Sequence, residues 1–295
     1  MTDQPADTAP AAPPRHDAQP RETKPGTDWW AEFKGMFWLV LAVLGFHSFI
    51  AKPFYIPSES MMPTLIKGDR LVVSKFPYGW SYVSPSFHVF PFIAGRLLGH
   101  LPARGDIVIV KPRFADSDYI KRVIGLPGDR LEVRDGQVFL NDRPVPKVAE
   151  APAMIPVDAN VPCDPDRLPG RRVAGAGGKL YCALPRFRET LPNGVSYDTI
   201  DLGYSPVDNY GPIAIPPHHL FLMGDNRDQS ADSRVSTQES GLGGPVPWED
   251  IGGRAEFITF SLDGTSALLN PISWITALRG GRAGTSLHPS RDTAR

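Results

Sequence analysis

Apolar and polar positions divide this sequence into one long apolar run followed by many short ones. The long run covers residues 35–51, GMFWLVLAVLGFHSFIA, which hold no formal charge and lie between Lys34 and Lys52. Its 17 residues are at the short end of what a helix needs to cross a bilayer, and the flanking lysines can extend their amines to the lipid headgroups. We therefore expect a single transmembrane helix, assigned to residues 35–53.

Two other interpretations of the apolar run remain open. It could form a buried core helix, because His47 and Ser48 lower its hydrophobicity. It could also be a cleaved signal sequence, although placing Ala51 at the cleavage point would put bulky Phe49 two residues before it, where a small side chain is needed. Basic residues on the two sides of the run are balanced, so charge alone does not decide which side faces the cytoplasm.

Short alternating or apolar runs follow, separated by turn residues, and they predict β-strands. Arg134, Asp135 and Gly136 separate two of these runs as a hairpin turn would. No pattern with a period of about 3.6 residues continues beyond the long apolar run, so the remainder of the chain is expected to be mainly β. The predicted strands are residues 71–76, 106–111, 119–124, 130–133, 137–140, 219–223 and 255–261.

Changes of composition along the chain predict its domain organisation. Residues 1–34 are rich in proline and charge and almost free of aliphatic side chains, which is typical of a disordered tail. Residues 143–217 are rich in proline and glycine and are interpreted as an insertion without a continuous core of its own. The β domain that receives it would consist of residues 54–142 and 218–270. Residues 271–295 are expected to form a peripheral C-terminal tail.

Charge and cysteine content narrow the possible functions. With 31 basic and 32 acidic side chains the formal net charge is −1, so the chain lacks the broad positive field of a nucleic-acid-binding protein. Cys163 and Cys182, both in the insertion, cannot form a four-thiolate zinc site, and they are either two thiols or one disulfide. We expect neither nucleic acid nor a metal as a partner.

Three segments contain residues that can carry chemistry. Residues 56–65, IPSESMMPTL, place two serine hydroxyls between two prolines shortly after the apolar run. Residues 119–129, YIKRVIGLPGD, put Lys121 on the partly apolar face of a predicted strand, a setting that can lower the pKa of a lysine. Residues 224–234, GDNRDQSADSR, carry five charges after an apolar strand. Taken singly, the segments also have ordinary interpretations: a turn, a strand-edge lysine and a solvated or calcium-binding loop.

Together, and in this order, the three segments resemble the bacterial type I signal peptidases, membrane-anchored serine proteases that use a Ser/Lys dyad. The resemblance also includes residues 101–108 and 244–252, and it extends from about Phe54 to Phe260. It implies a mainly β fold, with a signal-peptidase-like β catalytic core, an inserted β-rich subdomain and one preceding transmembrane helix.

By this resemblance Ser60 is the nucleophile and Lys121 is the general base. A serine hydroxyl is a weak nucleophile, and an unprotonated amine within hydrogen-bond reach can take its proton, so the lysine must be held neutral by apolar burial. Ser230 matches the hydroxyl that orients the lysine amine, and Ser58 matches the side chain that forms an oxyanion hole with the backbone N–H of Ser60. Glu59 departs from the family pattern, in which glycine is commonest between the two serines.

Further positions match supporting and substrate-binding residues of the family. The residues expected to support the site through ion pairs are Asp225, Asp232, Arg234 and Arg122. The residues expected to line shallow pockets for small side chains, as Ala-x-Ala cleavage sites require, are Phe54, Ile56, Leu65 and Ile120. The resemblance implies no cofactor.

The expected function is removal of signal peptides from exported preproteins by a membrane-bound serine endopeptidase that acts through an acyl-enzyme. We expect a single-pass protein of the bacterial inner (plasma) membrane, with its catalytic domain on the exported, periplasmic side, beside the protein-translocation machinery. One alternative is a specialised processing peptidase of the same superfamily, such as a pilin-maturing enzyme. A penicillin-recognising Ser/Lys enzyme is disfavoured, because its lysine would stand three residues after the serine, where this chain has Pro63. A third alternative is an inactive membrane-tethered binding module.

Overall fold

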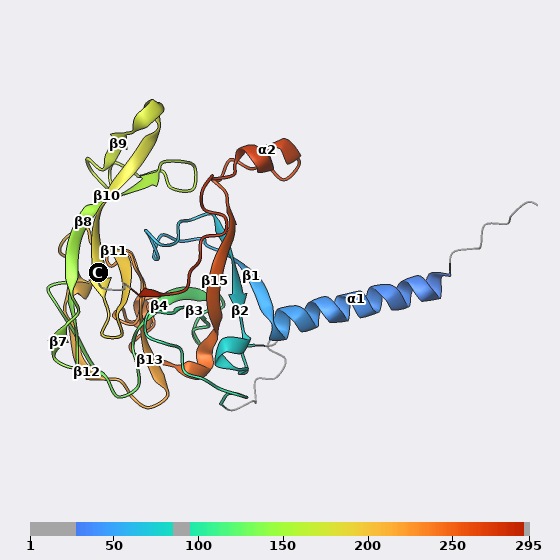
Figure 1. Ribbon diagram of the computed structural model, residues 1–295, viewed down its shortest axis with the longest axis horizontal. Helices are drawn as coiled ribbons and strands as arrows, with labels where there is room; N and C mark the ends of the chain where they lie inside the picture. The colour runs from blue at the N-terminus through green and yellow to red at the C-terminus, as the bar shows by residue number, and fades with distance from the viewer. Residues whose placement is uncertain (1–27, 85–94, 292–295) are drawn as a thin grey trace, which may run out of the picture. The chain divides into compact units, whose positions relative to one another are not determined.

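The structure of the protein is a computed structural model that describes residues 28–84 and 95–291 (Figure 1). The chain forms two compact units, residues 1–41 and residues 42–295. Most of the predicted disordered tail, residues 1–27, lies outside the described residues.

The first described element is helix α1, Trp29–Phe49, which begins six residues before the predicted span of 35–53. Asp28 explains the early start, because its Oδ1 accepts hydrogen bonds from the backbone N–H groups two and three residues later, at 3.1 and 3.3 Å. The helix ends at Phe49, and Lys52, which precedes Pro53 and is therefore disfavoured in the helical conformation, lies in the strand that follows. Residues 51–53 belong to strand β1, which corrects the predicted end of the helix.

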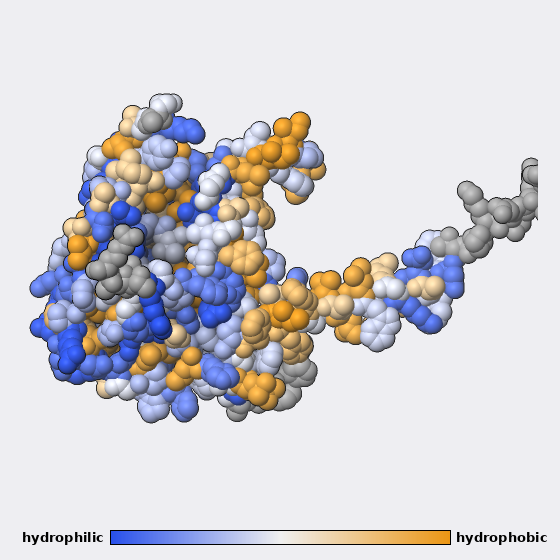
Figure 2. Space-filling model, viewed as in Figure 1, coloured by the Kyte–Doolittle hydropathy of each residue, from blue (hydrophilic) through white to orange (hydrophobic). Residues whose placement is uncertain are grey.

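The side chains of α1 are exposed on all sides. Ser48 is its only buried residue, whereas Trp38 is 64% exposed and Leu39 is 63% exposed. Apolar residues follow one another along this helix in Figure 2. The alternative of a buried core helix is therefore wrong, and among the described residues α1 is the one helix long and apolar enough to cross a membrane.

The remainder of the chain is mainly β, as predicted. Its largest sheet has seven strands in the order β1-β2-β15-β3-β4-β13-β14, and neighbouring strands in it are antiparallel. Five of these strands correspond to predicted ones, with ends that differ by a few residues. The strands of this sheet are β1 (Ala51–Tyr55), β2 (Asp69–Ser74), β3 (Ile107–Val110), β4 (Tyr119–Gly125), β13 (His219–Met223), β14 (Val246–Pro247) and β15 (Ile251–Ser261).

A four-stranded sheet contains strands from the β domain and strands from the predicted insertion, which was expected to begin at residue 143. The hairpin between β5 and β6 has the two-residue turn Asp135-Gly136, with φ of 47° and 73°, which allows the tight reversal that the sequence predicts. The sheet order is β12-β5-β6-β7, so two strands before residue 143 pair with two after it. Its strands are β5 (Arg130–Arg134), β6 (Gln137–Leu140), β7 (Arg143–Pro144) and β12 (Tyr210–Ala214).

The third sheet is built mostly from the insertion. Its order is β16-β11-β10-β8, with β9 paired to β10, and Figure 1 shows β8, β10 and β11 side by side. The strands are β8 (Lys147–Pro156), β9 (Arg172–Ala174), β10 (Leu180–Thr190), β11 (Val195–Ile200) and β16 (Ser290–Arg291). Among the residues that the structure describes, the remaining helical elements are α2 (Pro271–Thr276) and short 3₁₀ turns at Phe76–Tyr78, Ala176–Gly178, Pro206–Asp208, Thr237–Glu239 and Trp248–Asp250.

The insertion shares its apolar cores with the rest of the β structure. Val195 and Tyr197 of β11 pack in one cluster with Leu131 and Phe221. A second cluster joins residues of the insertion, including the two cysteines, to Met62 in the loop after β1. The insertion can therefore be recognised in the sequence by its composition, but in the structure it does not pack as a separate domain.

The C-terminal segment is not peripheral, which corrects the prediction for residues 271–295. Strand β16 pairs with β11, and Leu287 is 4% exposed within an apolar cluster that also contains Ile56. By contrast, α2 and the residues before it expose large apolar side chains, among them Leu269 at 95% (Figure 2). Local sequence could not distinguish these two halves of the segment, because their difference lies in what they pack against.

Cys163 and Cys182 form a disulfide. Replacing both with serine should lower the free energy of unfolding by about 3 kcal/mol, since the bridge closes a loop of roughly 20 residues in the unfolded chain. Urea denaturation of detergent-solubilised protein measures this loss. Reductant should lower the unfolding midpoint of the wild type and leave that of the double variant unchanged. Equal midpoints for the oxidised wild type and the variant would contradict the prediction.

Candidate active site

Ser60 lies in the loop that leaves β1 and returns as β2. The backbone N–H of Ile56 donates to the carbonyl of Asp69 at 2.9 Å, and the N–H of Gly68 donates to the carbonyl of Ile56 at 3.0 Å, so the two ends of the loop are held together. The carbonyl of Ser60 accepts from the backbone N–H of Asn226 at 3.1 Å. The 56–65 and 224–234 segments, far apart in sequence, therefore meet at this serine.

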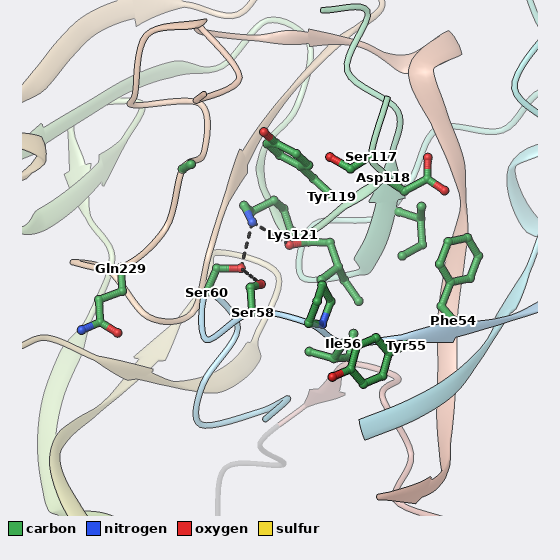
Figure 3. A pocket seen from close by; sticks show the side chains of 14 residues that line it. Phe54, Tyr55, Ile56, Ser58, Ser60, Ser117, Asp118, Tyr119, Lys121 and Gln229 are labelled. Carbon is green, nitrogen blue, oxygen red and sulfur yellow. Dashed lines mark hydrogen bonds between the residues drawn. The ribbon is translucent and has the colours of Figure 1, made fainter. Parts of the chain in front are cut away.

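Lys121 reaches Ser60 from strand β4. Its Nζ lies 3.0 Å from Oγ of Ser60 and donates to the carbonyl of Ile120 at 2.9 Å (Figure 3). The lysine is 3% exposed, and the ring centroid of Tyr119 is 5.5 Å from Nζ. The geometry thus brings together the two residues that the sequence predicts as base and nucleophile.

Burial lowers the pKa of Lys121 to about 8. Asp232 and Asp225 act in the opposite direction, because a nearby carboxylate favours the charged amine, and Arg234 again favours the neutral form. A lysine with this pKa is a free amine in about one molecule in ten at pH 7, whereas an ordinary lysine is free in fewer than about one in a thousand. Such an amine can accept a proton from a hydroxyl 3.0 Å away.

A cavity of about 290 Å³ opens beside these two side chains. Ser58 lines it, with its Oγ 3.4 Å from that of Ser60. One wall comes from β1 and the residues after it, and the other from the start of β4 (Figure 3). The lining residues are Phe54, Tyr55, Ile56, Pro57, Ser58, Ser60, Ile109, Ser117, Asp118, Tyr119, Ile120, Lys121, Gln229 and Ala231.

Leu65 does not line this cavity, although the sequence predicts it as a pocket residue. It is 0% exposed and packs in an apolar cluster with Ile56 and Ile120. The loop turns Leu65 inward because its backbone N–H donates to the carbonyl of Met61 at 2.9 Å, closing a helical turn. The other three predicted pocket residues do line the cavity.

Ser230 lies against the loop that carries Ser60. It is buried, and within the part of the chain that the structure describes its Oγ has no hydrogen-bond partner. Gly224 allows the close approach, because a Cβ at this position would lie 2.2 Å from Oγ of Ser230 and 2.4 Å from the carbonyl oxygen of Ser60. The structure therefore places Ser230 close to Ser60, and it does not contain the predicted hydrogen bond to Lys121.

Arg122 and Asp225, two of the residues expected to support the site through ion pairs, pair with each other. Nε and Nη2 of Arg122 each donate to one oxygen of Asp225 at 2.7 Å, and both side chains are buried. Nη1 of Arg122 donates to the carbonyl of Gly105 at 2.8 Å. Thr64, which sequence reasoning missed, donates its hydroxyl to Asp225 at 2.6 Å. This pair connects strand β4 to the two other candidate segments.

Asp232 and Arg234 form a second buried pair. Nε and Nη2 of Arg234 donate to the two carboxylate oxygens at 3.0 and 2.9 Å. The backbone N–H of Gly224 donates to the same carboxylate at 3.0 Å. Burial alone would raise the pKa of Asp232, but the arginine and the backbone donors together hold it below the ordinary value. The 224–234 loop is therefore held together by hydrogen bonds between its own residues, with the carboxylate of Asp232 as the common acceptor.

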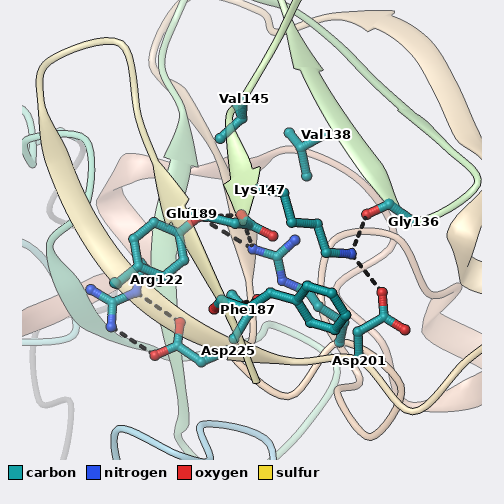
Figure 4. A network of polar contacts seen from close by, with 12 residues as sticks. Arg122, Gly136, Val138, Val145, Lys147, Phe187, Glu189, Asp201 and Asp225 are labelled. Atoms are coloured by element: carbon teal, nitrogen blue, oxygen red, sulfur yellow. Dashed lines mark hydrogen bonds and ion pairs between the residues drawn. The ribbon is translucent and has the colours of Figure 1, made fainter. Parts of the chain in front are cut away.

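Sequence reasoning missed a third buried group that reaches the site from the insertion (Figure 4). Glu189 of β10 accepts from Nη2 of Arg227 at 2.7 Å and from the hydroxyl of Tyr197 at 2.9 Å. The ring centroid of Tyr197 is 4.4 Å from the guanidinium carbon of Arg122. Arg227 belongs to the quoted 224–234 motif, whereas Glu189 and Tyr197 stand in strands whose local sequence does not signal a site.

Glu59 is not among the residues that line the cavity beside Ser60 and Lys121. With Arg167 and the two bridged cysteines it lines a small cavity of about 30 Å³. Its carbonyl accepts from the side-chain amide of Asn226 at 3.1 Å. Within residues 28–84 and 95–291, no group of three or more His, Cys, Asp and Glu side chains is arranged to hold a metal ion.

Comparisons with known proteins agree on one family. Residues 29–260 match the family described as "Signal peptidase, peptidase S26". A signal peptidase I of Rickettsia typhi (strain ATCC VR-144 / Wilmington) is 33% identical over 275 residues, covering 87% of this chain and 93% of that protein. A signal peptidase I of Rickettsia bellii (strain OSU 85-389) is 32% identical over 281 residues, covering 88% of this chain and 86% of the other.

One solved structure is also similar. It is a signal peptidase I from Enterococcus faecalis V583, 20% identical, with a TM-score of 0.28, and the match covers 52% of this chain and 97% of that chain. A superposition of this quality adds nothing to the description of the fold. The sequence match over residues 29–260 and the Rickettsia relatives decide the assignment. The chain belongs to the signal peptidase family, peptidase S26, and is a serine peptidase of that family.

Proposed function

We propose that this chain is a membrane-anchored endopeptidase that removes signal peptides from exported preproteins, with Ser60 as nucleophile and Lys121 as general base. The observation that carries the proposal is the 3.0 Å contact between Oγ of Ser60 and the buried amine of Lys121, whose pKa is lowered to about 8. Family membership supports removal of signal peptides as the reaction. The assignment of the two residues rests on geometry and electrostatics.

The proposed mechanism is acyl transfer. Oγ of Ser60 attacks the scissile carbonyl while the neutral amine of Lys121 takes its proton. The hydroxyl of Ser58 and the backbone N–H of Ser60 donate to the oxyanion that forms. Lys121 then gives the proton to the leaving amine, and a water activated by the same amine hydrolyses the acyl-enzyme.

We assign to Ser230 the orientation of the lysine amine. Its buried hydroxyl has no partner among the described residues, and a buried polar group without a partner is unfavourable. A rotation that turned this hydroxyl towards Lys121 would remove the deficit and fix the amine. The ion pairs of Arg122 with Asp225 and of Arg234 with Asp232 support the loop and carry out no chemistry.

The cavity supports recognition of an extended peptide with small side chains. β1 is the edge strand of its sheet, so backbone donors and acceptors along that edge are available to a peptide. The apolar side chains of Phe54, Ile56 and Ile120 line a space of about 290 Å³, which suits small residues at Ala-x-Ala sites. Asp118 is exposed at the lining of the same cavity.

The proposed location is the bacterial inner membrane. Helix α1 supports a single span, and the reaction requires that residues after it lie on the exported side, beside the translocation machinery. A narrower processing peptidase, such as a pilin-maturing enzyme, would use the same site with a different substrate. An inactive membrane-tethered module would keep the fold without turnover.

Ser60→Ala should lower kcat by about 10⁴- to 10⁶-fold, because the nucleophile is lost while binding persists. The measurement is cleavage of a purified preprotein by detergent-solubilised enzyme. Ser58→Ala, which removes one oxyanion donor, should lose only about 10²- to 10³-fold. If a folded Ser60→Ala variant cleaves at the wild-type rate, Ser60 is not the nucleophile.

The pH dependence of kcat/KM should show an acidic limb with a midpoint near 8, the pKa of Lys121. Activity rises with pH through this value, because the base works only as a neutral amine and is protonated below it. Lys121→Arg should be as inactive as Lys121→Ala, since a guanidinium stays protonated. Substantial turnover by the arginine variant would show that this position contributes only positive charge.

Membrane topology is tested with spheroplasts. A protease added outside should digest the chain beyond residue ~55 and spare a fragment that contains the first ~34 residues, because α1 crosses the bilayer. Lysed spheroplasts should lose the protection of that fragment. The reverse protection pattern would contradict both the topology and the proposed function, and absence of residues before α1 from the mature protein would indicate a cleaved signal sequence.

A further inference from the structure

The segment after α2, residues 277–291, crosses back over the β structure and is called here the C-terminal strap. It lies beyond residues 29–260, the range that matches the family. Backbone bonds connect it to β15, because the N–H of Ile258 donates to the carbonyl of Thr285 at 2.9 Å and the N–H of Gly284 donates to the carbonyl of Ile258 at 2.7 Å. The strap is therefore held along its length before it reaches β16.

Arg282 of the strap binds the return half of the loop that carries Ser60. Its Nε donates to Oδ1 of Asp69 at 2.8 Å, and its Nη2 donates to Oδ2 of the same carboxylate. Nη2 also donates to the carbonyl of Thr64 at 3.0 Å. One planar guanidinium thus contacts two positions of the loop that are five residues apart.

Asp69, the main partner of Arg282, connects three parts of the nucleophile loop. It is 0% exposed, and its Oδ2 accepts from the backbone N–H of Ile66 at 2.9 Å. Its carbonyl accepts from the backbone N–H of Ile56 at 2.9 Å. A buried carboxylate needs a charged partner, and Arg282 is the one ion-pair partner that Asp69 has among the described residues.

Thr64, the second partner, connects the strap with the active site. Its carbonyl accepts from Arg282, while its hydroxyl donates to Asp225 at 2.6 Å. Asp225 is paired with Arg122, the neighbour of Lys121 on β4. Arg282 is therefore connected to β4, the strand that presents Lys121, through Thr64 and Asp225.

Arg279 attaches the strap to the same loop and to the insertion. Its Nη1 donates to the carbonyl of Lys67 at 2.7 Å, and its Nε and Nη2 donate to the carboxylate of Asp158 in the insertion at 2.7 and 2.8 Å. Leu287 packs in the same apolar cluster as Ile56. Two arginines and one leucine of the strap thus hold the loop from its outer side.

From these contacts we propose that the C-terminal strap holds the Ser60 loop in register with Lys121, and that Arg282 is the positioning residue through which it acts. The inference rests on the proposed function, in which Ser60 attacks and Lys121 accepts its proton. Without Arg282, the carboxylate of Asp69 and the carbonyl of Thr64 lose their partner and the loop relaxes. The distance between Oγ of Ser60 and Nζ of Lys121 then increases, and chemistry slows, while the parts of the cavity wall formed by β1 and by the start of β4 stay in place.

The test compares Arg282→Gln and Arg282→Lys with wild type in full-length, detergent-solubilised protein. With a soluble peptide that contains an Ala-x-Ala site, Arg282→Gln should lower kcat by about 10- to 100-fold and leave KM unchanged, because misplacement of a reacting group by ~1 Å has a cost of this size. Its acidic limb should move to higher pH, since a looser loop admits water to Lys121 and weakens the desolvation that favours the free amine.

Arg282→Lys covers the case in which the glutamine variant does not fold. The ammonium keeps a positive charge beside Asp69, so the fold is expected to persist, but it cannot reproduce the planar fork to Asp69 and Thr64. Its kcat should lie between those of wild type and Arg282→Gln. The matched control is Arg130→Gln, which removes an exposed ion pair with Asp142 in the four-stranded sheet and should retain the wild-type kcat.

Two results overturn the proposal. One is a wild-type kcat in folded Arg282→Lys. The other is a lower thermal midpoint for Arg282→Gln with kcat and acidic limb unchanged below that midpoint, which would indicate a merely structural role. Failure of the proposed function looks different, because wild type itself would then show no turnover, or Ser60→Ala would be as active as wild type.

Discussion

The free energy of burying one lysine amine governs the arrangement of this protein. A charged amine is unfavourable in an apolar interior, so the pKa of Lys121 falls to about 8. Two carboxylates close by, Asp232 and Asp225, act against this shift. Each of them is bound by an arginine, Arg234 or Arg122, through both side-chain oxygens. The arginines satisfy the carboxylates, and the proposed base can stay neutral beside the proposed nucleophile.

Ion pairs also hold distant segments together. Arg122 connects β4 to the 224–234 loop, Arg227 connects that loop to Glu189 in the insertion, and Arg282 connects the loop of Ser60 to the strap. Buried ion pairs contribute little net stability, because desolvation offsets much of their attraction. Here they act on geometry. Each planar guanidinium holds the segment that it binds in one orientation, and the candidate active-site residues on those segments are positioned in this way.

Elements with a local signal could be predicted from the sequence. Apolar runs predicted the strand that carries Lys121, and the Asp135-Gly136 pair predicted a hairpin with a two-residue turn, because these features depend on neighbouring residues alone. The start of α1 could also have been found, since Asp28 is a typical N-cap residue. Leu65 was placed wrongly because the loop after Ser60 has no regular alternation from which to infer which side chains face inward.

Residues that act over long sequence separations could not be found in this way. The insertion was recognised by its composition, yet the pairing of Glu189 with Arg227 spans 38 residues, and that of Asp69 with Arg282 spans 213. Sequence alone determined the apolar helix and the mainly β character, and a family resemblance pointed to the serine and the lysine that we propose as nucleophile and base. Only the tertiary structure decided that the two side chains lie 3.0 Å apart, that the insertion shares a core with the β domain and that the C-terminal strap binds the nucleophile loop. The reason is physical: a strand or helix is specified by adjacent residues, whereas a buried charge takes its partner from whichever segment the folded chain brings beside it.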